Sequence, residues 1–242
     1  MVVFLHGFTH TGASWDPVIA ALGERYRDVI APDIRGHGRA SGALPVTLSA
    51  VVEDVAALTG DSFELVGYSM GGRIALHVAL ALPGRASRLV LIGASPGLDD
   101  PDERAARLRA DRALADEFEG MGTEEVADLW ESRTASPRGV LAGQPASVRK
   151  GVRVDRLRNT PAGLARALRG LGTGALPSVW ERLAELAMPV VLVVGERDAK
   201  FRGIADRMAG LLPRARVVVV SGAGHAAHLE APDTVAEIVA KP

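Results

Sequence analysis

The stretch FELVGYSMGGR, residues 63–73, decides the fold expected for this chain. Residues 63–66 form a short apolar run typical of a buried strand, and residues 71–82 have apolar side chains at helical spacing. Between them, residues 67–71 match the pattern G-x-S-x-G. In this strand, turn and helix context, the pattern places Ser69 on a sharp turn with its hydroxyl exposed, and the glycines let strand and helix approach closely.

The same alternation of short apolar runs and helical spacing extends along most of the chain. Further strands are expected at Met1 to Leu5, Asp28 to Pro32, Arg88 to Ile92, Pro189 to Val194 and Arg216 to Val220. Helical spacing occupies Trp15 to Gly23, Leu48 to Leu58 and Phe201 to Leu212. This rhythm predicts a doubly wound α/β fold, with a mostly parallel sheet and helices on both faces.

The rhythm breaks between residues 98 and 180. Arg, Ala, Glu and Leu dominate there at helical spacing, and prolines interrupt the pattern. We expect residues 1–97 and 181–242 to form the α/β core and residues 98–180 to form an inserted helical cap. The other interpretation of the charged residues in this insertion is a solvated helical surface with no role in chemistry.

Composition limits the possible classes of protein. The 242 residues are 48% hydrophobic and 24% charged, which fits one globular domain with a sizeable core. A formal net charge of −1 gives no general attraction for nucleic acid. The absence of cysteine excludes disulfides, thiolate chemistry and Cys-based zinc sites. The N-terminal run lacks the features of a signal peptide and no apolar stretch suits a membrane span, so a cytoplasmic protein is expected.

A serine needs an imidazole to take its proton and an acid to orient that imidazole. Asp198 follows the strand predicted at 189–194, and His225 follows the one predicted at 216–220. The order Ser69, Asp198, His225 is that of a catalytic triad on this fold. Glu196 is the rival acid, and Asp198 has the alternative role of capping the helix that follows it.

Two backbone amides are expected to form an oxyanion hole. One belongs to Phe8, which follows the first strand, and the other to Met70, the residue after the serine. His225 and His228 have the spacing of a metal pair, but no third ligand is evident, so no metal and no cofactor are implied. His228 and His37 are interpreted as packed or hydrogen-bonded structural residues.

Four elements together resemble the α/β-hydrolase superfamily: H-G-F at 6–8, D-I-R-G-H-G at 33–38, G-Y-S-M-G-G-R at 67–73 and G-A-G-H at 222–225. More narrowly, the chain resembles the 2-succinyl-6-hydroxy-2,4-cyclohexadiene-1-carboxylate synthases, which are lyases of menaquinone biosynthesis. This resemblance lies in Arg73, in the S-P-G-L stretch at 95–98 with the arginines after it, in R-N-T-P-A-G-L at 158–164 and in G-E-R-D-A-K-F at 195–201.

The resemblance implies a small substrate with several carboxylates, which guanidinium groups bind in bidentate fashion. The substrate-binding residues it implies are Tyr68, Arg73, Arg107, Trp130 and Arg158. The alternatives are that the arginines pair with acidic residues on helix surfaces and that Trp130 belongs to the core of the cap.

The implied reaction is removal of a ring proton by Ser69, activated by His225, followed by elimination of pyruvate. The nearest alternative is a serine esterase or carbon–carbon hydrolase that uses Ser69 as a covalent nucleophile. A third is a ligand-binding scaffold without catalysis. The chain also begins directly at the His-Gly strand, so we expect a sheet shorter than is usual in the superfamily.

Overall fold

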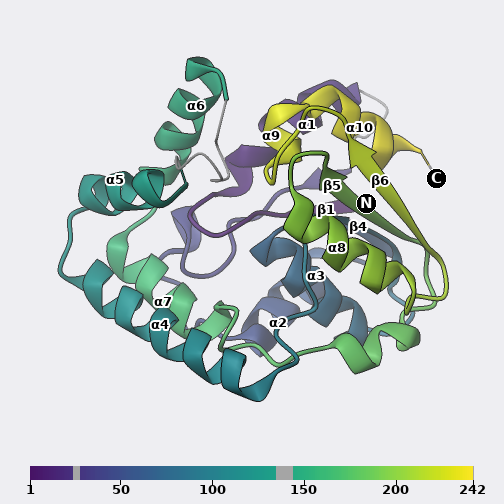
Figure 1. Cartoon of the computed structure of the whole chain (residues 1–242), viewed down its shortest axis with the longest axis horizontal. Coiled ribbons are helices and arrows are strands. Elements are labelled where there is room, and N and C mark those ends of the chain that lie inside the picture. The colour runs from purple at the N-terminus through teal and green to yellow at the C-terminus, as the bar shows by residue number, and fades with distance from the viewer. Residues whose placement is uncertain (24–27, 135–143, 242) are drawn as a thin grey trace.

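The computed structural model describes residues 1–23, 28–134 and 144–241, which contain one sheet of parallel strands (Figure 1). The strand order is β2-β1-β3-β4-β5-β6. The strands are β1 (Val2–Leu5), β2 (Val29–Ile30), β3 (Phe63–Tyr68), β4 (Ala86–Ile92), β5 (Val190–Gly195) and β6 (Ala215–Val220). The predicted α/β fold is confirmed, although β2 is shorter than the expected 28–32.

Helices cover both faces of the sheet, as its continuous apolar strands require. One face packs against α1 (Asp16–Leu22) and α10 (Pro232–Ala240), which also contact each other. The other face packs against α2 (Leu48–Leu58), α3 (Met70–Ala81) and α8 (Ala199–Ala209). Side chains alternate between these two cores along each strand, so Val3 and Leu5 face one core while Val2 and Phe4 face the other.

The segment between β4 and β5 is helical. It contains α4 (Pro101–Glu119), α5 (Thr123–Thr134), α6 (Ala146–Arg156) and α7 (Pro161–Leu171), followed by a 3-10 helix at Trp180–Glu185. Helices α4 and α7 lie side by side and share a small apolar core of their own (Figure 1). In the part of the chain that the structure describes, no helix is long and apolar enough to cross a membrane.

Buried polar contacts attach α6 to the loop after β1. Asp155 accepts hydrogen bonds from the Thr11 amide at 3.1 Å and from the Thr11 hydroxyl, and its other neighbour is His10 Nδ1 at 3.1 Å. Asn159 donates to the carbonyl of Thr9 at 2.8 Å and accepts from the amide of Gly38 at 3.0 Å. These contacts fix the end of α6 against the edge of the sheet where β1 and β2 end.

Candidate active site

Three loops bring Ser69, His225 and Asp198 into one hydrogen-bonded row. Ser69 lies between β3 and α3, Asp198 follows β5, and His225 follows β6. Oγ of Ser69 is 3.1 Å from Nε2 of His225, and Nδ1 of His225 is 2.6 Å from Oδ2 of Asp198. With the proton on Nδ1, the imidazole donates to the carboxylate and its Nε2 accepts from the serine. The row therefore has the geometry that proton transfer from the serine needs.

The turn that carries Ser69 is strained and depends on glycine. Ser69 has φ 51° and ψ −107°, a backbone conformation that residues other than glycine rarely adopt. A Cβ at Gly71 would lie 2.1 Å from the carbonyl oxygen of Leu5, and one at Gly67 would lie 2.6 Å from that of Gly71. Only glycine at these two positions lets α3 approach β1 and β3 closely enough to hold the serine in place.

The imidazole of His225 is packed on several sides. The ring of Phe201 has its centroid 4.3 Å away and that of Tyr68 lies 5.4 Å away. Gly93, at the end of β4, has φ +54°, and a Cβ there would come within 2.8 Å of the imidazole. These contacts restrict the ring to the orientation in which it meets Ser69.

The structure brings Asp198, and not Glu196, to the imidazole. The carboxylate of Glu196 points away and accepts hydrogen bonds from the Gly222 amide at 2.8 Å and the Ser221 hydroxyl at 3.2 Å. These bonds lower the pKa of Glu196. Asp198 also caps α8, because its Oδ1 accepts from the Phe201 amide at 3.3 Å. Asp198 thus has the contacts that both of the predicted roles require, those of an acid beside the imidazole and of a helix cap.

His228 is a packed residue in this structure. Its ring is fully buried, with centroids 4.6 Å from Trp15 and 4.2 Å from Tyr68. Burial, with His10 and His225 nearby, holds its pKa well below the ordinary value. Across the described ranges, no cluster of His, Asp and Glu has the arrangement of a metal site.

The loop after β1, which carries Phe8, runs close to the residue before Ser69, since a Cβ at Gly7 would lie 3.6 Å from the carbonyl oxygen of Tyr68. His6 Nε2 accepts from the Ile34 amide at 2.9 Å, and His6 Nδ1 donates to the carbonyl of Gly7 at 2.9 Å. Burial lowers the pKa of His6 to about 4, so the ring is neutral at pH 7 and can do both. Met70 begins α3, where the first amides have no helical acceptor. The positions of Phe8 and Met70 suit the predicted oxyanion hole, which stays a prediction.

Ser69 opens into a cavity of about 310 Å³ that carries positive charge. Its basic lining residues are Arg73, Arg107, Lys200 and Arg207. Asp99 also lines it and accepts from Arg207 at 2.6 Å. Lys200 and Arg207 were not predicted, although their i and i+7 spacing with Ile204 on α8 is a signal that places them on one helix face.

Arg73 lies at the base of this cavity, one turn after Ser69 on α3. It is 7% exposed and donates to the Thr173 hydroxyl at 2.8 Å and the Leu171 carbonyl at 3.3 Å. Burial, with Arg107 nearby, lowers its pKa to about 10. Arg107, on α4, also lines the cavity and donates to Asp111 at 2.7 Å. The structure thus brings two of the three predicted arginines to the cavity.

Arg158 is the arginine that the structure places elsewhere. It is exposed and lies in a separate surface depression with Thr11, Asp33 and Arg39. Helix α6 ends at Arg156, so Arg158 lies in the turn beyond the helix and faces outward. The prediction that Arg158 lines the same site as Ser69 is therefore wrong in this structure.

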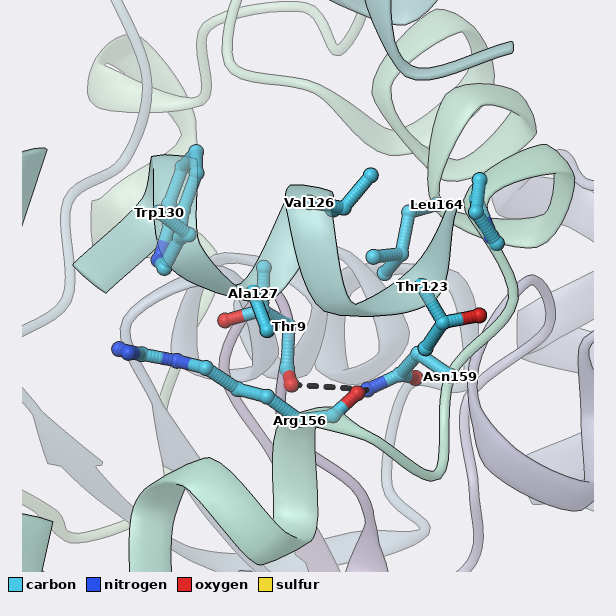
Figure 2. A pocket seen from close by; sticks show the side chains of 9 residues that line it. Thr9, Thr123, Val126, Ala127, Trp130, Arg156, Asn159 and Leu164 are labelled. Atoms are coloured by element: carbon cyan, nitrogen blue, oxygen red, sulfur yellow. Dashed lines mark hydrogen bonds between the residues drawn. The ribbon is translucent and has the colours of Figure 1, made fainter. Parts of the chain in front are cut away.

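Trp130 and Tyr68 are also outside the cavity lining. Trp130 lines a small enclosed pocket beneath α5, together with Thr9, Arg156 and Asn159 (Figure 2). The Trp130 ring packs against Phe8 at 4.9 Å, so its place agrees with the alternative of a cap core residue. Tyr68 is 3% exposed and lies behind His225, where burial raises its pKa. Neither residue lines the cavity at Ser69: Tyr68 packs against His225 and Trp130 packs against Phe8.

The chain is similar to known proteins over nearly its whole length. A family model described as the alpha/beta hydrolase family matches residues 2–238. The chain belongs to the alpha/beta hydrolase family. It is 35% identical over 248 residues to the 2-succinyl-6-hydroxy-2,4-cyclohexadiene-1-carboxylate synthase of Salmonella paratyphi C, covering 99% of this chain and 92% of that protein. It is 38% identical over 250 residues to a Bacillus subtilis protein assigned provisionally to the same activity, covering 99% of this chain and 89% of that one.

Solved structures similar to this chain include MenH and an esterase. MenH from S. aureus superposes with a TM-score of 0.89 and 31% identity, covering 99% of this chain and 91% of that chain. A thermophilic esterase from Thermogutta terrifontis, solved with malate bound, gives a TM-score of 0.79 and 27% identity, covering 99% and 87%. The narrower resemblance predicted from the sequence is confirmed by these relatives.

Proposed function

We propose that this protein is a lyase that eliminates pyruvate from a polycarboxylated cyclohexene intermediate of menaquinone biosynthesis. The proposed setting is the cytoplasm, with a small molecule as the only substrate and no nucleic acid involved. The similarity over 99% of the chain to proteins named 2-succinyl-6-hydroxy-2,4-cyclohexadiene-1-carboxylate synthase supports the reaction. The basic cavity at Ser69 is the single observation that carries the proposal.

The charge of the cavity matches the substrate class. Arg73 is buried, and its two hydrogen-bond acceptors are a hydroxyl and a carbonyl, which are both neutral. A guanidinium in low dielectric attracts a carboxylate strongly, and its fork binds both oxygens. Lys200, on the rim beside Phe201, adds an exposed positive charge. An ester with an apolar acid part would leave these groups without a purpose.

In the proposed mechanism, His225 takes the proton of Ser69 as the serine oxygen removes a proton from the substrate ring. The electron pair left on the ring forms a new carbon–carbon double bond as the carbon–oxygen bond breaks. The leaving group departs as the enolate of pyruvate and takes up the proton held by His225 to give pyruvate. Asp198 holds the imidazole in the tautomer that can accept this proton. The amides of Phe8 and Met70 stabilise the negative charge that develops on a substrate carbonyl oxygen. Residues 98–180 act as the cap that carries Arg107 over the site.

Ester or carbon–carbon hydrolysis is the second candidate, because the same row also activates a serine for covalent attack. The likeness to the T. terrifontis esterase favours it. The two candidates differ in what they ask of Arg73. Proton abstraction from a polycarboxylate needs this cation for binding, whereas attack on a simple aryl ester does not.

The test measures pyruvate release from the pathway intermediate by the wild-type protein, Ser69→Ala and Arg73→Met, with p-nitrophenyl acetate as a comparison substrate. We expect Ser69→Ala to lower kcat by about 10⁴-fold or more, since the reacting oxygen is lost. Arg73→Met should raise KM by about 100-fold through the loss of a charge-assisted bidentate contact. It should leave ester turnover within about threefold of wild type.

Arg88→Met is the matched control for Arg73→Met. Arg88 is also buried, at 6% exposure, but it donates to the carbonyls of Ile238 and Val239 far from the cavity. We expect it to alter the melting temperature without raising KM. Ester turnover that needs Ser69, with no pyruvate release from wild type, would overturn the lyase in favour of the hydrolase.

A further inference from the structure

Glu230, at the end of α9 (Ala227–Glu230), is a buried carboxylate that lies outside the cavity and binds the loop of His225. Its side chain is 3% exposed. Oε2 accepts from the Gly224 amide at 2.8 Å, and Oε1 accepts from the Ala226 amide at 3.2 Å. The two amides flank His225 in the sequence, so one side chain holds the backbone on both sides of the imidazole.

The same carboxylate reaches two other segments. Nη2 of Arg197, the residue before Asp198, donates to Oε2 at 2.9 Å. The Gln144 side-chain amide, from the segment between β4 and β5, also donates to Oε2. Glu230 therefore joins the loop of the imidazole, the loop of its acid partner and the helical segment above them. None of these contacts faces Ser69 or lines its cavity.

We infer that Glu230 is a positioning residue that sets the distance and angle of His225 relative to Asp198 and Ser69. This inference rests on the proposed function only in that the row does chemistry. The reason lies in the donors: the two loop amides, Arg197 and Gln144 all donate, and a carboxylate accepts without donating in return. A glutamine would direct its own N–H groups at some of these donors and leave a buried amide unpaired.

The close packing of this region makes the loop sensitive to such a change. A Cβ at Gly195, which ends β5, would lie 2.0 Å from the carbonyl oxygen of Gly224, so the loops of Asp198 and His225 touch through backbone. A small movement of the 224–226 backbone changes the Nε2–Oγ distance of 3.1 Å, and catalysis falls steeply with such displacement. The effect of Glu230 is thus expected on the rate of the reacting complex and not on substrate binding.

The experiment compares wild type with Glu230→Gln in two measurements. In steady-state pyruvate release, we expect kcat to fall about 10- to 100-fold while KM stays within about twofold, because the cavity is unchanged. In proton NMR of the free protein, the downfield Nδ1 proton of His225, assigned with His225→Gln, should shift or broaden in Glu230→Gln. The NMR measurement needs no substrate.

Two further variants make the result decisive. Glu237→Gln is the matched control, since Glu237 is an exposed glutamate on α10 that pairs only with Lys241 at 3.7 Å, and it should change neither measurement. Arg197→Ala removes one donor at a half-exposed position and tests the same link if Glu230→Gln does not fold. It should lower kcat about five- to tenfold and shift the same NMR signal.

Unchanged kcat and an unchanged NMR signal in Glu230→Gln, or in Arg197→Ala if Glu230→Gln does not fold, would overturn the inference. A rise in KM together with the fall in kcat of Glu230→Gln, with the NMR signal unchanged, would also overturn the inference, because it would assign Glu230 to substrate binding. If the wild-type protein releases no pyruvate but Glu230→Gln still shifts the NMR signal of His225, the positioning role stands and the proposed lyase function fails.

Discussion

Successive turns of α3 hold buried polar groups in two different ways. At the start of the helix, Ser69, His225 and Asp198 satisfy one another in a closed row. One and two turns later, Arg73 and His77 are equally buried, yet Arg73 Nε and His77 Nε2 have no hydrogen-bond partner among the described residues. We call the second pair the basic wall, of which Arg73 lines the cavity and His77 lies one turn further along the helix.

The difference matches the proposed division between residues that carry out the chemistry and residues that bind the substrate. The row is complete within the protein, so its geometry is already set before any substrate arrives. The basic wall carries desolvated nitrogen atoms that lower the stability of the folded chain. At Arg73, which lines the cavity, such a cost is consistent with a surface shaped for an anion. The variants below are chosen to show whether the two regions are as independent as this comparison suggests.

Of the three changes below, Asp198→Asn should have the largest effect, and we expect that effect to be confined to the row. We expect kcat to fall about 10³- to 10⁴-fold, because asparagine no longer selects the imidazole tautomer that accepts from Ser69. The melting temperature should change little, since the asparagine oxygen can still accept from the Phe201 amide that caps α8. Steady-state kinetics of pyruvate release and thermal unfolding measure both quantities.

Glu196→Gln is the control for that change, because Glu196 lies in the same loop and does not contact the imidazole. It should keep kcat within about threefold of wild type. If Glu196→Gln were as inactive as Asp198→Asn, the acid of the row would not be Asp198 alone.

His77→Met tests the basic wall through stability. Burial, with Arg73 and Arg182 nearby, lowers the pKa of His77 to about 4. Between pH 6.5 and 4 the unfolded chain binds a proton at this histidine and the folded chain does not, so the free energy of unfolding falls as pH falls. We expect the methionine variant to lose less stability than wild type between pH 7 and pH 5, by about 1–2 kcal/mol. Urea unfolding across this range, with identical pH dependence in the two proteins as the contrary result, decides the point.

Arg107→Ala should have the smallest effect of the three. Arg107 is half-exposed and already paired with Asp111, so its attraction for a substrate carboxylate is screened. We expect KM to rise about fivefold with kcat unchanged. Arg158→Ala, at an exposed arginine outside the cavity, is the control and should leave KM within about twofold. Equal increases in KM for the two variants would mean that the cavity borders are not those described.

The sequence was informative where function follows from position on a strand. Ser69, Asp198 and His225 each come directly after a strand of one parallel sheet, and parallel strands end at a common edge, so their meeting could be predicted. The helical segment offers no such rule. Whether Arg156 or Arg158 faces inward depends on where α6 ends, and sequence patterns locate helix ends poorly.

Side chains that act by holding the backbone are harder still to predict from the sequence. Glu230 stands in no catalytic motif, and its contacts depend on the path of the loop around Gly224. Lys200 and Arg207 were missed because the spacing of α8 also suits an ordinary solvated face. The sequence thus predicts the fold and the row, while packing decides which cations line the cavity.

Gly93 has a practical meaning for anyone who wishes to redesign the cavity. It lines the same cavity as Ser69, and it looks like a small, adaptable position. The Cβ of any other residue there would lie 2.8 Å from the imidazole, and that residue would have to adopt a positive φ. Libraries that randomise the cavity should therefore keep residue 93 fixed, since variation there would yield folded proteins with a displaced base and would be mistaken for failures of substrate fit.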